Sequence, residues 1–219
     1  MLKSSVGRKI IMALSGIFLI IFLTQHLLIN ITSIFESDGQ TFNKLSHFMG
    51  TNPIVQFVLQ PILILGVIIH FSMGIYLEIL NRRSRQISYV KYSGKSSSSW
   101  ASRNMIISGL VILSFLFMHF YDFWIPEINT KYIQGDWTGM HDGEFRYFHE
   151  LQLKFKDQLF RVVIYCISFI LLGMHLVHGL GSSLQSMGIT KGPIKLISTL
   201  FSVLVPFGFI FIAVFHYLN

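Results

Sequence analysis

The sequence predicts an all-α integral membrane protein, a bundle of five transmembrane helices, and two observations lead to this fold class. First, 52% of the 219 residues are hydrophobic and only 12% are charged, whereas soluble domains average about 25% charged residues. So little polar surface cannot cover so many apolar side chains in water. Second, five apolar stretches each reach the length of about 20 residues that crossing a bilayer requires.

We expect one transmembrane domain over residues 1–219, without internal repeats and without a separate soluble domain. The first span has a basic start like a signal peptide, but its apolar run is too long and lacks a cleavage site, so we expect it to be retained. A surface helix is expected around residues 144–155, and a Ser-rich inner loop at 94–100. The predicted spans cover about 10–31, 54–80, 104–125, 159–184 and 195–217.

The basic residues predict that the N-terminus is cytoplasmic. With this orientation most of the 17 Lys and Arg residues lie inside, many of them in the loop 82–103, while nearly all of the ten acidic residues lie outside. The net charge of +7 therefore fits a membrane and not a nucleic acid partner. The single cysteine, Cys166, excludes an internal disulfide and any cysteine-ligated zinc or iron–sulfur centre.

Four consecutive spans each carry a histidine inside the apolar run: His26, His70, His119 and His175. Ionisable residues at this depth are costly, which makes them functional candidates. For any one of them, a hydrogen bond to a neighbouring helix is an adequate explanation, but four in consecutive spans favour a shared role.

The depth of these histidines predicts two layers. Counted from the inner ends of the spans, His26 and His119 lie about 10 Å further out than His70 and His175, at 1.5 Å per residue. Each layer then holds two histidines from two different helices. Two bis-histidine haems stacked across a membrane require this arrangement, because each iron takes an axial imidazole from either side.

Two glycines support the inner layer. Gly74 and Gly179 follow His70 and His175 by four residues, and therefore share their helix faces. A glycine there leaves room for a porphyrin plane, although close helix packing would also explain it. Gly66 and Gly173 are expected to add space around the same layer.

The remaining histidines are weaker candidates. His178 lies three residues after His175 and rivals it as a ligand; spacing favours His175, with His178 beside the haem or its propionates. We expect His216 to face the lipid headgroups at the outer end of the last span. The histidines expected to be solvated or interfacial are His47, His141 and His149.

At these residues the chain resembles a known family, the five-helix, single-polypeptide, di-haem cytochrome b subunit of menaquinone-linked succinate:quinone oxidoreductases. The resemblance covers the first four spans, and the fifth matches in hydropathy only. The segments that carry it are IFLTQHLLIN, FNKLSHFMGTNP, VIIHFSMGIY, SFLFMHFYDFW and HLVHGLGSSLQSMGIT.

The resemblance implies two b haems, with helix one paired with helix three and helix two with helix four. Its histidine pattern falls on His26, His70, His119 and His175, and places His175 ahead of His178. Some fumarate-reducing relatives carry a glutamate two residues before the fourth ligand, implicated in proton movement. This chain has Gly173 there, which removes that route from the expectation.

The resemblance also implies partners and a reaction. A flavoprotein (FAD) subunit and an iron–sulfur subunit would dock on the cytoplasmic face of a bacterial inner membrane and oxidise succinate. This chain, which has no catalytic residues for that oxidation, would pass the electrons through both haems to menaquinone. The basic loop 82–103 is a candidate docking surface, or only a topology signal.

The quinone region is expected near the outer layer, because quinone reduction consumes two protons and needs protonatable groups close to water. His47 and Asp122 are the principal candidates, and the alternative is that such residues only mark the membrane interface. The other polar residues in the outer halves of the first and third spans are Thr24, Gln25, Asn30 and Tyr121.

Two other functions compete with this interpretation. One is the di-haem cytochrome b of another quinone-linked dehydrogenase, for formate or hydrogen, in which the ligands are distributed differently. The other is a transporter whose histidines relay protons or bind a metal. A transporter would be expected to carry acidic partners inside the spans, where Glu78 is the only candidate.

Overall fold

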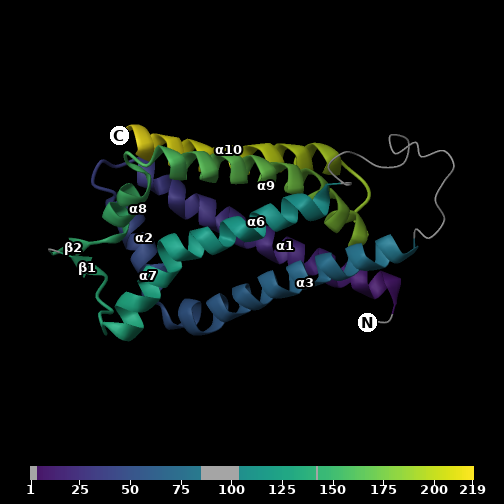
Figure 1. Cartoon of the computed structure of the whole chain (residues 1–219), viewed down its shortest axis with the longest axis horizontal. Helices are drawn as coiled ribbons and strands as arrows, with labels where there is room; N and C mark the ends of the chain where they lie inside the picture. The colour runs from purple at the N-terminus through teal and green to yellow at the C-terminus, as the bar shows by residue number, and fades with distance from the viewer. Residues whose placement is uncertain (1–3, 85–103, 142) are drawn as a thin grey trace.

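The computed structural model describes residues 4–84, 104–141 and 143–219, which form a bundle of long helices (Figure 1). Five segments are long and apolar enough to cross a membrane, so the predicted all-α, multi-pass membrane architecture is confirmed. The predicted Ser-rich loop at 94–100 and most of the basic loop 82–103 lie outside the described residues. The five segments are Ser5–Ile34, Val55–Arg83, Met105–Ile133, Leu159–Ser186 and Ile194–Leu218.

Three of these segments combine an α-helix with tighter or wider turns. The first ends in a 3₁₀ turn, η1, and the second begins with a π-turn, η2. The third is interrupted by the π-turn η3 and ends in the π-turn η4. The bounds are α1 Ser5–Asn30, η1 Ile31–Ile34, η2 Val55–Leu59, α3 Gln60–Ser84, α6 Met105–His119, η3 Phe120–Trp124, α7 Ile125–Ile128, η4 Asn129–Ile133, α9 Leu159–Ser186 and α10 Ile194–Leu218.

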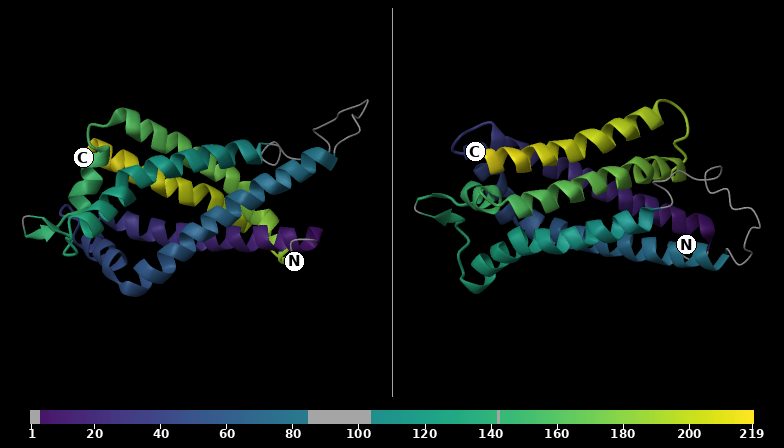
Figure 2. Two further views of the ribbon diagram at one scale, coloured as in Figure 1. Left: turned by 60° about the horizontal axis from the view of Figure 1, so that its bottom comes forward. Right: turned by 45° about the horizontal axis from the view of Figure 1, so that its top comes forward.

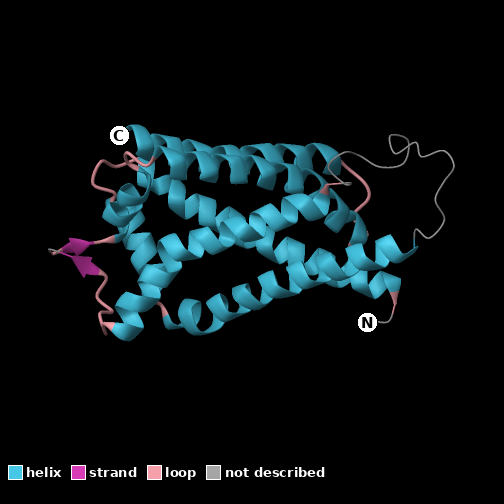
Figure 3. Ribbon diagram, viewed as in Figure 1, coloured by secondary structure: helices cyan, strands magenta, loops and turns pink. Residues whose placement is uncertain are grey.

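Short elements gather at the end of the bundle that carries the C-terminus, opposite the N-terminus (Figures 1 and 2). We call this the capped end. It contains the small antiparallel hairpin, in which Met140 pairs with Phe145 and which is the described sheet (Figure 3). The elements are α2 Gln40–Thr51, β1 Met140–His141, β2 Glu144–Phe145 and α8 Tyr147–Phe155. The surface helix expected around residues 144–155 is α8, whereas α2 was not anticipated.

Helix α9 is the centre of the bundle. It packs most extensively against α10 and also contacts α6 and α1, while α1 in turn packs against α3. A buried cluster joins α2, α8, α9 and α10 near the capped end, so that the cap and the spans share one core. Its members are Phe42, Phe148, Leu151, Phe155, Val162, Tyr165, Phe169, Val205, Phe209 and Ala213.

Close contacts fix the positions of the helices around this core. A Cβ on Gly173 would lie 3.0 Å from the backbone oxygen of Ser202, and one on Gly66 would lie 2.8 Å from the ring of Phe18. The expectation that Gly66 and Gly173 leave space around the inner histidines is therefore wrong. Both glycines allow neighbouring helices to approach one another.

The cap is attached through α2 and α8. Gly39 adopts φ +61° before α2, and a Cβ there would overlap the ring of Phe148 at 2.2 Å, so only glycine fits. The Asn43 side-chain oxygen accepts a 2.8 Å hydrogen bond from the backbone N–H of Phe148. These contacts hold the cap against the ends of the spans.

Candidate functional site

The structure brings the four histidines of the spans together as two pairs. The rings of His26 on α1 and His119 on α6 lie 5.7 Å apart and nearly perpendicular, at 89°. The rings of His70 on α3 and His175 on α9 lie 6.3 Å apart at 68°. These are the pairs expected from depth, and the role of the histidines as haem ligands stays a prediction.

The ring spacing of both pairs is compatible with a single metal ion between two imidazoles, and it also lies within the range of ordinary edge-to-face ring contacts. A metal–imidazole bond is about 2 Å, so two nitrogens on opposite sides lie about 4 Å apart and the ring centres about 6 Å apart. The observed 5.7 and 6.3 Å match this value. Each pair also joins two helices that are far apart in sequence, as a cofactor held inside a bundle requires.

Aromatic side chains surround the outer pair, His26 and His119. Phe22 stacks on His26 at 5.4 Å and Phe115 stacks on His119 at 5.8 Å. Phe209 of α10 contributes a third ring, 5.7 Å from His26. This wall is apolar on several sides, which suits a large planar cofactor and keeps water away from it.

The inner histidines instead receive a serine from the neighbouring helix. Ser15 Oγ lies 3.2 Å from Nδ1 of His70, and Ser108 Oγ lies 3.1 Å from Nδ1 of His175. In the outer pair, Nδ1 of His26 lies 3.5 Å from the Asn30 side-chain nitrogen. Nδ1 of His119 is buried without a hydrogen-bond partner among the described residues.

A sequence repeat underlies these contacts, contrary to the expectation of no internal repeats. The pattern Met-x-x-Ser-Gly-x5-Phe-x3-His occurs in residues 12–26 and again in 105–119. The partner helices share His-x-x-x-Gly, at 70–74 and 175–179. The repeat is short and lies in uniformly apolar sequence, where hydropathy does not distinguish it.

Gly74 and Gly179, the glycines that follow the inner histidines by four residues, differ from the packing glycines Gly66 and Gly173. Within 4 Å, a Cβ on Gly74 would meet only the end of Met12, at 3.7 Å, and one on Gly179 only the end of Met105, at 3.3 Å. Flexible methionine ends can move aside, so these positions retain room near the inner pair. The ring facing His70 is that of His175, and half-buried His178 lies further along α9.

Asp122 lies in the interior, on the π-turn η3 directly after His119. Its carboxylate accepts a 2.9 Å hydrogen bond from Tyr165 and lies 3.4 Å from Arg161, with only 2% of the residue exposed. Tyr121 beside it points outward and is 67% exposed. The two adjacent candidates for the quinone region therefore face opposite directions.

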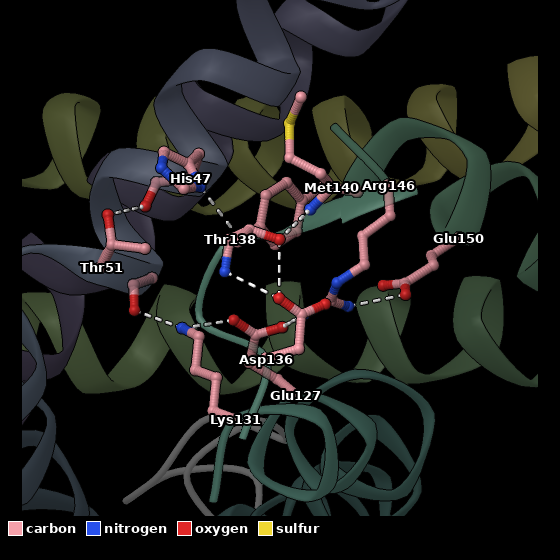
Figure 4. A network of polar contacts seen from close by, with 11 residues as sticks. His47, Thr51, Glu127, Lys131, Asp136, Thr138, Met140, Arg146 and Glu150 are labelled. Carbon is pink, nitrogen blue, oxygen red and sulfur yellow. Dashed lines mark hydrogen bonds and ion pairs between the residues drawn. The ribbon is translucent and has the colours of Figure 1, made fainter. Parts of the chain in front are cut away.

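His47 belongs to a separate polar network at the capped end (Figure 4). Its ring stacks on Phe145 of the hairpin at 4.4 Å, and Tyr147 Oη lies 3.5 Å from its Nδ1. Burial, together with the charge of Glu127, raises the pKa of Tyr147 to about 12. The His47 side chain thus extends from α2 to the hairpin, where the neutral phenol of Tyr147 lies beside it.

An ion-pair network anchors the same region (Figure 4). Glu127 pairs with Lys131 at 2.5 Å and with Arg146, which also binds Glu150 at 2.6 Å. Lys131, only 2% exposed, donates to the backbone oxygen of Gly50 near the end of α2. At the hairpin, Thr138 donates two hydrogen bonds to Asp136 and lowers its carboxyl pKa.

His216 is buried, and the expectation that it faces lipid headgroups is wrong. Only 1% of the residue is exposed, its Nε2 lies 2.8 Å from Ser33 Oγ, and its ring packs against Phe148 at 5.8 Å. It joins α10 to η1 and α8. The burial of His216 could not be predicted from its position near the end of a span, because it depends on contacts with η1 and α8, which are distant in sequence.

The fold and these sites define a multi-pass helical membrane protein with two interior histidine pairs. No family of known proteins, no curated protein and no solved structure matches the chain.

Proposed function

We propose that the chain is the membrane anchor and electron-transfer subunit of a succinate dehydrogenase, with two b haems between its helices. The observation that carries this proposal is the pair of histidine contacts at 5.7 and 6.3 Å, each joining two different spans. Both distances match the ring spacing across a single metal ion. Sequence resemblance suggests the specific enzyme.

Each pair would hold one haem iron: His26 with His119, and His70 with His175. When bound, haem supplies a one-electron carrier whose potential depends on axial ligands, hydrogen bonds and burial. The chain's residues provide those conditions. Phe22 and its neighbours would keep water from the outer pair, and the space at Gly74 and Gly179 would leave room for a planar group at the inner pair.

The proposed complex is oriented by charge. The N-terminal end of the bundle would face the bacterial cytoplasm and receive the FAD-containing flavoprotein and the iron–sulfur subunit. Electrons would enter at the inner pair and leave at the outer pair, which lies closer to the capped end. Lipid surrounds the spans, since α3 in particular buries little of its apolar surface.

The quinone, which we propose to be menaquinone, would be reduced near the capped end. Asp122 is the third residue after His119, the proposed outer ligand. Tyr165 and Arg161, both on α9, contact its carboxylate. His47 and Tyr147 lie within the cap. These protonatable groups are what a site that takes up two protons needs, because a carboxylate or imidazole can transfer them.

Coexpression with the partner subunits tests the proposal. The chain should copurify with a flavoprotein and an iron–sulfur protein, and succinate should reduce its b-type absorption bands. Reduction by formate or hydrogen through another dehydrogenase, with no response to succinate, would instead favour the alternative di-haem cytochromes. A preparation without haem would contradict both.

A further inference from the structure

We propose that Ser15 and Ser108 are positioning residues that fix the tautomer of His70 and His175 and lower the midpoint potential of the inner haem. This inference rests on the proposed function, because it concerns the group that the inner pair would bind. Each serine acts through the imidazole whose Nδ1 it contacts, at 3.2 Å for Ser15 and 3.1 Å for Ser108.

The proton of each serine determines the tautomer. A hydroxyl has one proton to donate, and Ser15 lies 3.0 Å from the backbone oxygen of Met12 while Ser108 lies 2.9 Å from that of Met105. With its proton given to that carbonyl, the hydroxyl can only accept from the imidazole. In this arrangement Nδ1 carries the hydrogen of His70 and of His175, and at His175 the Met105 backbone oxygen can accept it as well. The lone pair on Nε2 is then free for a metal.

The same arrangement occurs twice, in two helix pairs. Ser15 on α1 reaches His70 on α3, and Ser108 on α6 reaches His175 on α9. In each case the next residue is a glycine whose Cβ would lie against the same imidazole, 3.4 Å from Cε1 of His70 for Gly16 and 3.6 Å from Cε1 of His175 for Gly109. A contact needed only for local packing has no reason to recur with the same serine, glycine and ring nitrogen.

The outer pair shows that the contact is specific to the inner layer. Among the described residues, Nδ1 of His119 has no hydrogen-bond partner, and Nδ1 of His26 has only the distant Asn30 nitrogen at 3.5 Å. Phenylalanines, and not serines, lie against the outer rings. The two layers therefore offer chemically different surroundings to the same type of ligand.

This difference has a consequence for the potential. A ligating imidazole that donates its other N–H becomes a stronger electron donor to the metal, and a stronger donor stabilises the oxidised form. Removing the serine hydroxyl should therefore raise the potential of the inner haem and leave that of the outer haem in place. Because both histidines of the inner pair have such a contact, the two removals should act in the same direction.

The experiment is a redox titration of the purified complex, followed by the b-type absorption bands, for Ser15→Ala, Ser108→Ala, Ser15→Thr and Ser108→Thr. The matched control is Ser114→Ala on the same helix α6. Among the described residues, its exposed hydroxyl donates a hydrogen bond to the backbone oxygen of Leu110 and contacts no histidine. We expect each alanine variant to shift the oxidised-to-reduced ratio of one haem about tenfold, which is about 59 mV for one electron. The threonine variants, which keep the hydroxyl, and Ser114→Ala should titrate like wild type.

The other outcomes separate this inference from the function on which it rests. Two bound haems with unchanged potentials in both alanine variants would overturn the role of the serines and leave the proposed function intact. If an alanine variant loses the inner haem, restoration of haem and native potential by threonine supports the inference, and loss in both contradicts it. A wild-type chain without haem would refute the proposed function itself.

Discussion

Tyr165 on α9 donates a 2.9 Å hydrogen bond to Asp122 on η3, and each residue is only 2% exposed. The π-turn that begins at Phe120 widens the helix by one residue directly after His119. Asp122, three residues after His119 and on the same helix face, points to the interior, while Tyr121 points outward. A carboxylate is thus placed at the capped side of the outer histidine pair, with a phenol and Arg161 next to it.

This placement predicts the behaviour of Asp122→Asn. The asparagine oxygen can still accept from Tyr165, so the fold and the haem content should persist, but the residue can no longer take up a proton. Quinone reduction should fall by at least about tenfold, within the range for loss of a proton-transfer group, while succinate oxidation with an artificial acceptor continues.

His47→Leu should lower quinone reduction in the same assay. The control is Tyr121→Phe, which changes an exposed side chain beside Asp122. If both Asp122→Asn and His47→Leu keep full quinone reductase activity, while substitutions of Glu78 and His178 abolish it, the quinone region lies at the other end of the bundle.

The two neighbouring histidines of α9 should behave differently. His175→Ala should remove the inner haem, because its ring is the one 6.3 Å from that of His70. His178→Ala should keep both haems. Quantifying haem per chain in the two variants is sufficient, and the opposite pattern would identify His178 as the ligand.

The ion-pair network of the cap predicts a large effect at Lys131. Lys131→Met should destabilise the protein by about 1.5–3 kcal/mol, because it removes the buried hydrogen bond to the Gly50 backbone oxygen and one of the two ion pairs of Glu127, while Arg146 still pairs with Glu127. Arg82→Met is the matched control, since it breaks the exposed i,i+4 pair with Glu78, where about 1 kcal/mol or less is expected. Thermal unfolding in detergent compares them; equal losses in the two variants would refute a structural role for the buried network.

Tyr147 predicts a dependence on alkaline pH. Its pKa is raised from 10.0 to about 12 in the folded protein, so between these values the folded state holds the phenol proton more tightly than the unfolded state. The free energy of unfolding then decreases as the pH rises through that window. The melting temperature should be measured at about pH 9 and about pH 11, one unit below and one unit above the ordinary tyrosine pKa. Between these two values it should fall more for wild type than for Tyr147→Phe.

A control variant, Tyr132→Phe, changes an exposed tyrosine of η4 instead and should follow wild type over the same pH range. Parallel melting curves for wild type and Tyr147→Phe would contradict the effect attributed to Tyr147.

Hydropathy and residue count along the sequence predicted the spans and the relative depth of the histidines in them. They were sufficient for the five spans and for the association of His26 with His119 and His70 with His175, because depth in a membrane follows directly from residue count. They also agree with the inward direction of Asp122, which lies three residues after His119 and so shares its helix face. They could not predict its contacts with Tyr165 and Arg161.

Features of the cap depend on contacts between segments distant in sequence and were missed. The burial of His216 against Ser33 and Phe148 requires η1 and α8 to fold over the end of α10. The serine contacts are different, because their repeat can be read in residues 12–26 and 105–119. Only the structure shows that Ser15 and Ser108 face the inner histidines.

The central claim is that each histidine pair holds one haem, and haem stoichiometry tests it most directly. Pyridine haemochrome analysis of the purified wild-type chain should give two b haems per polypeptide. His26→Ala and His119→Ala should each leave the same single haem, and His70→Ala should leave the other. A wild-type chain without haem, or a haem set that does not change in any of these variants, would contradict the account.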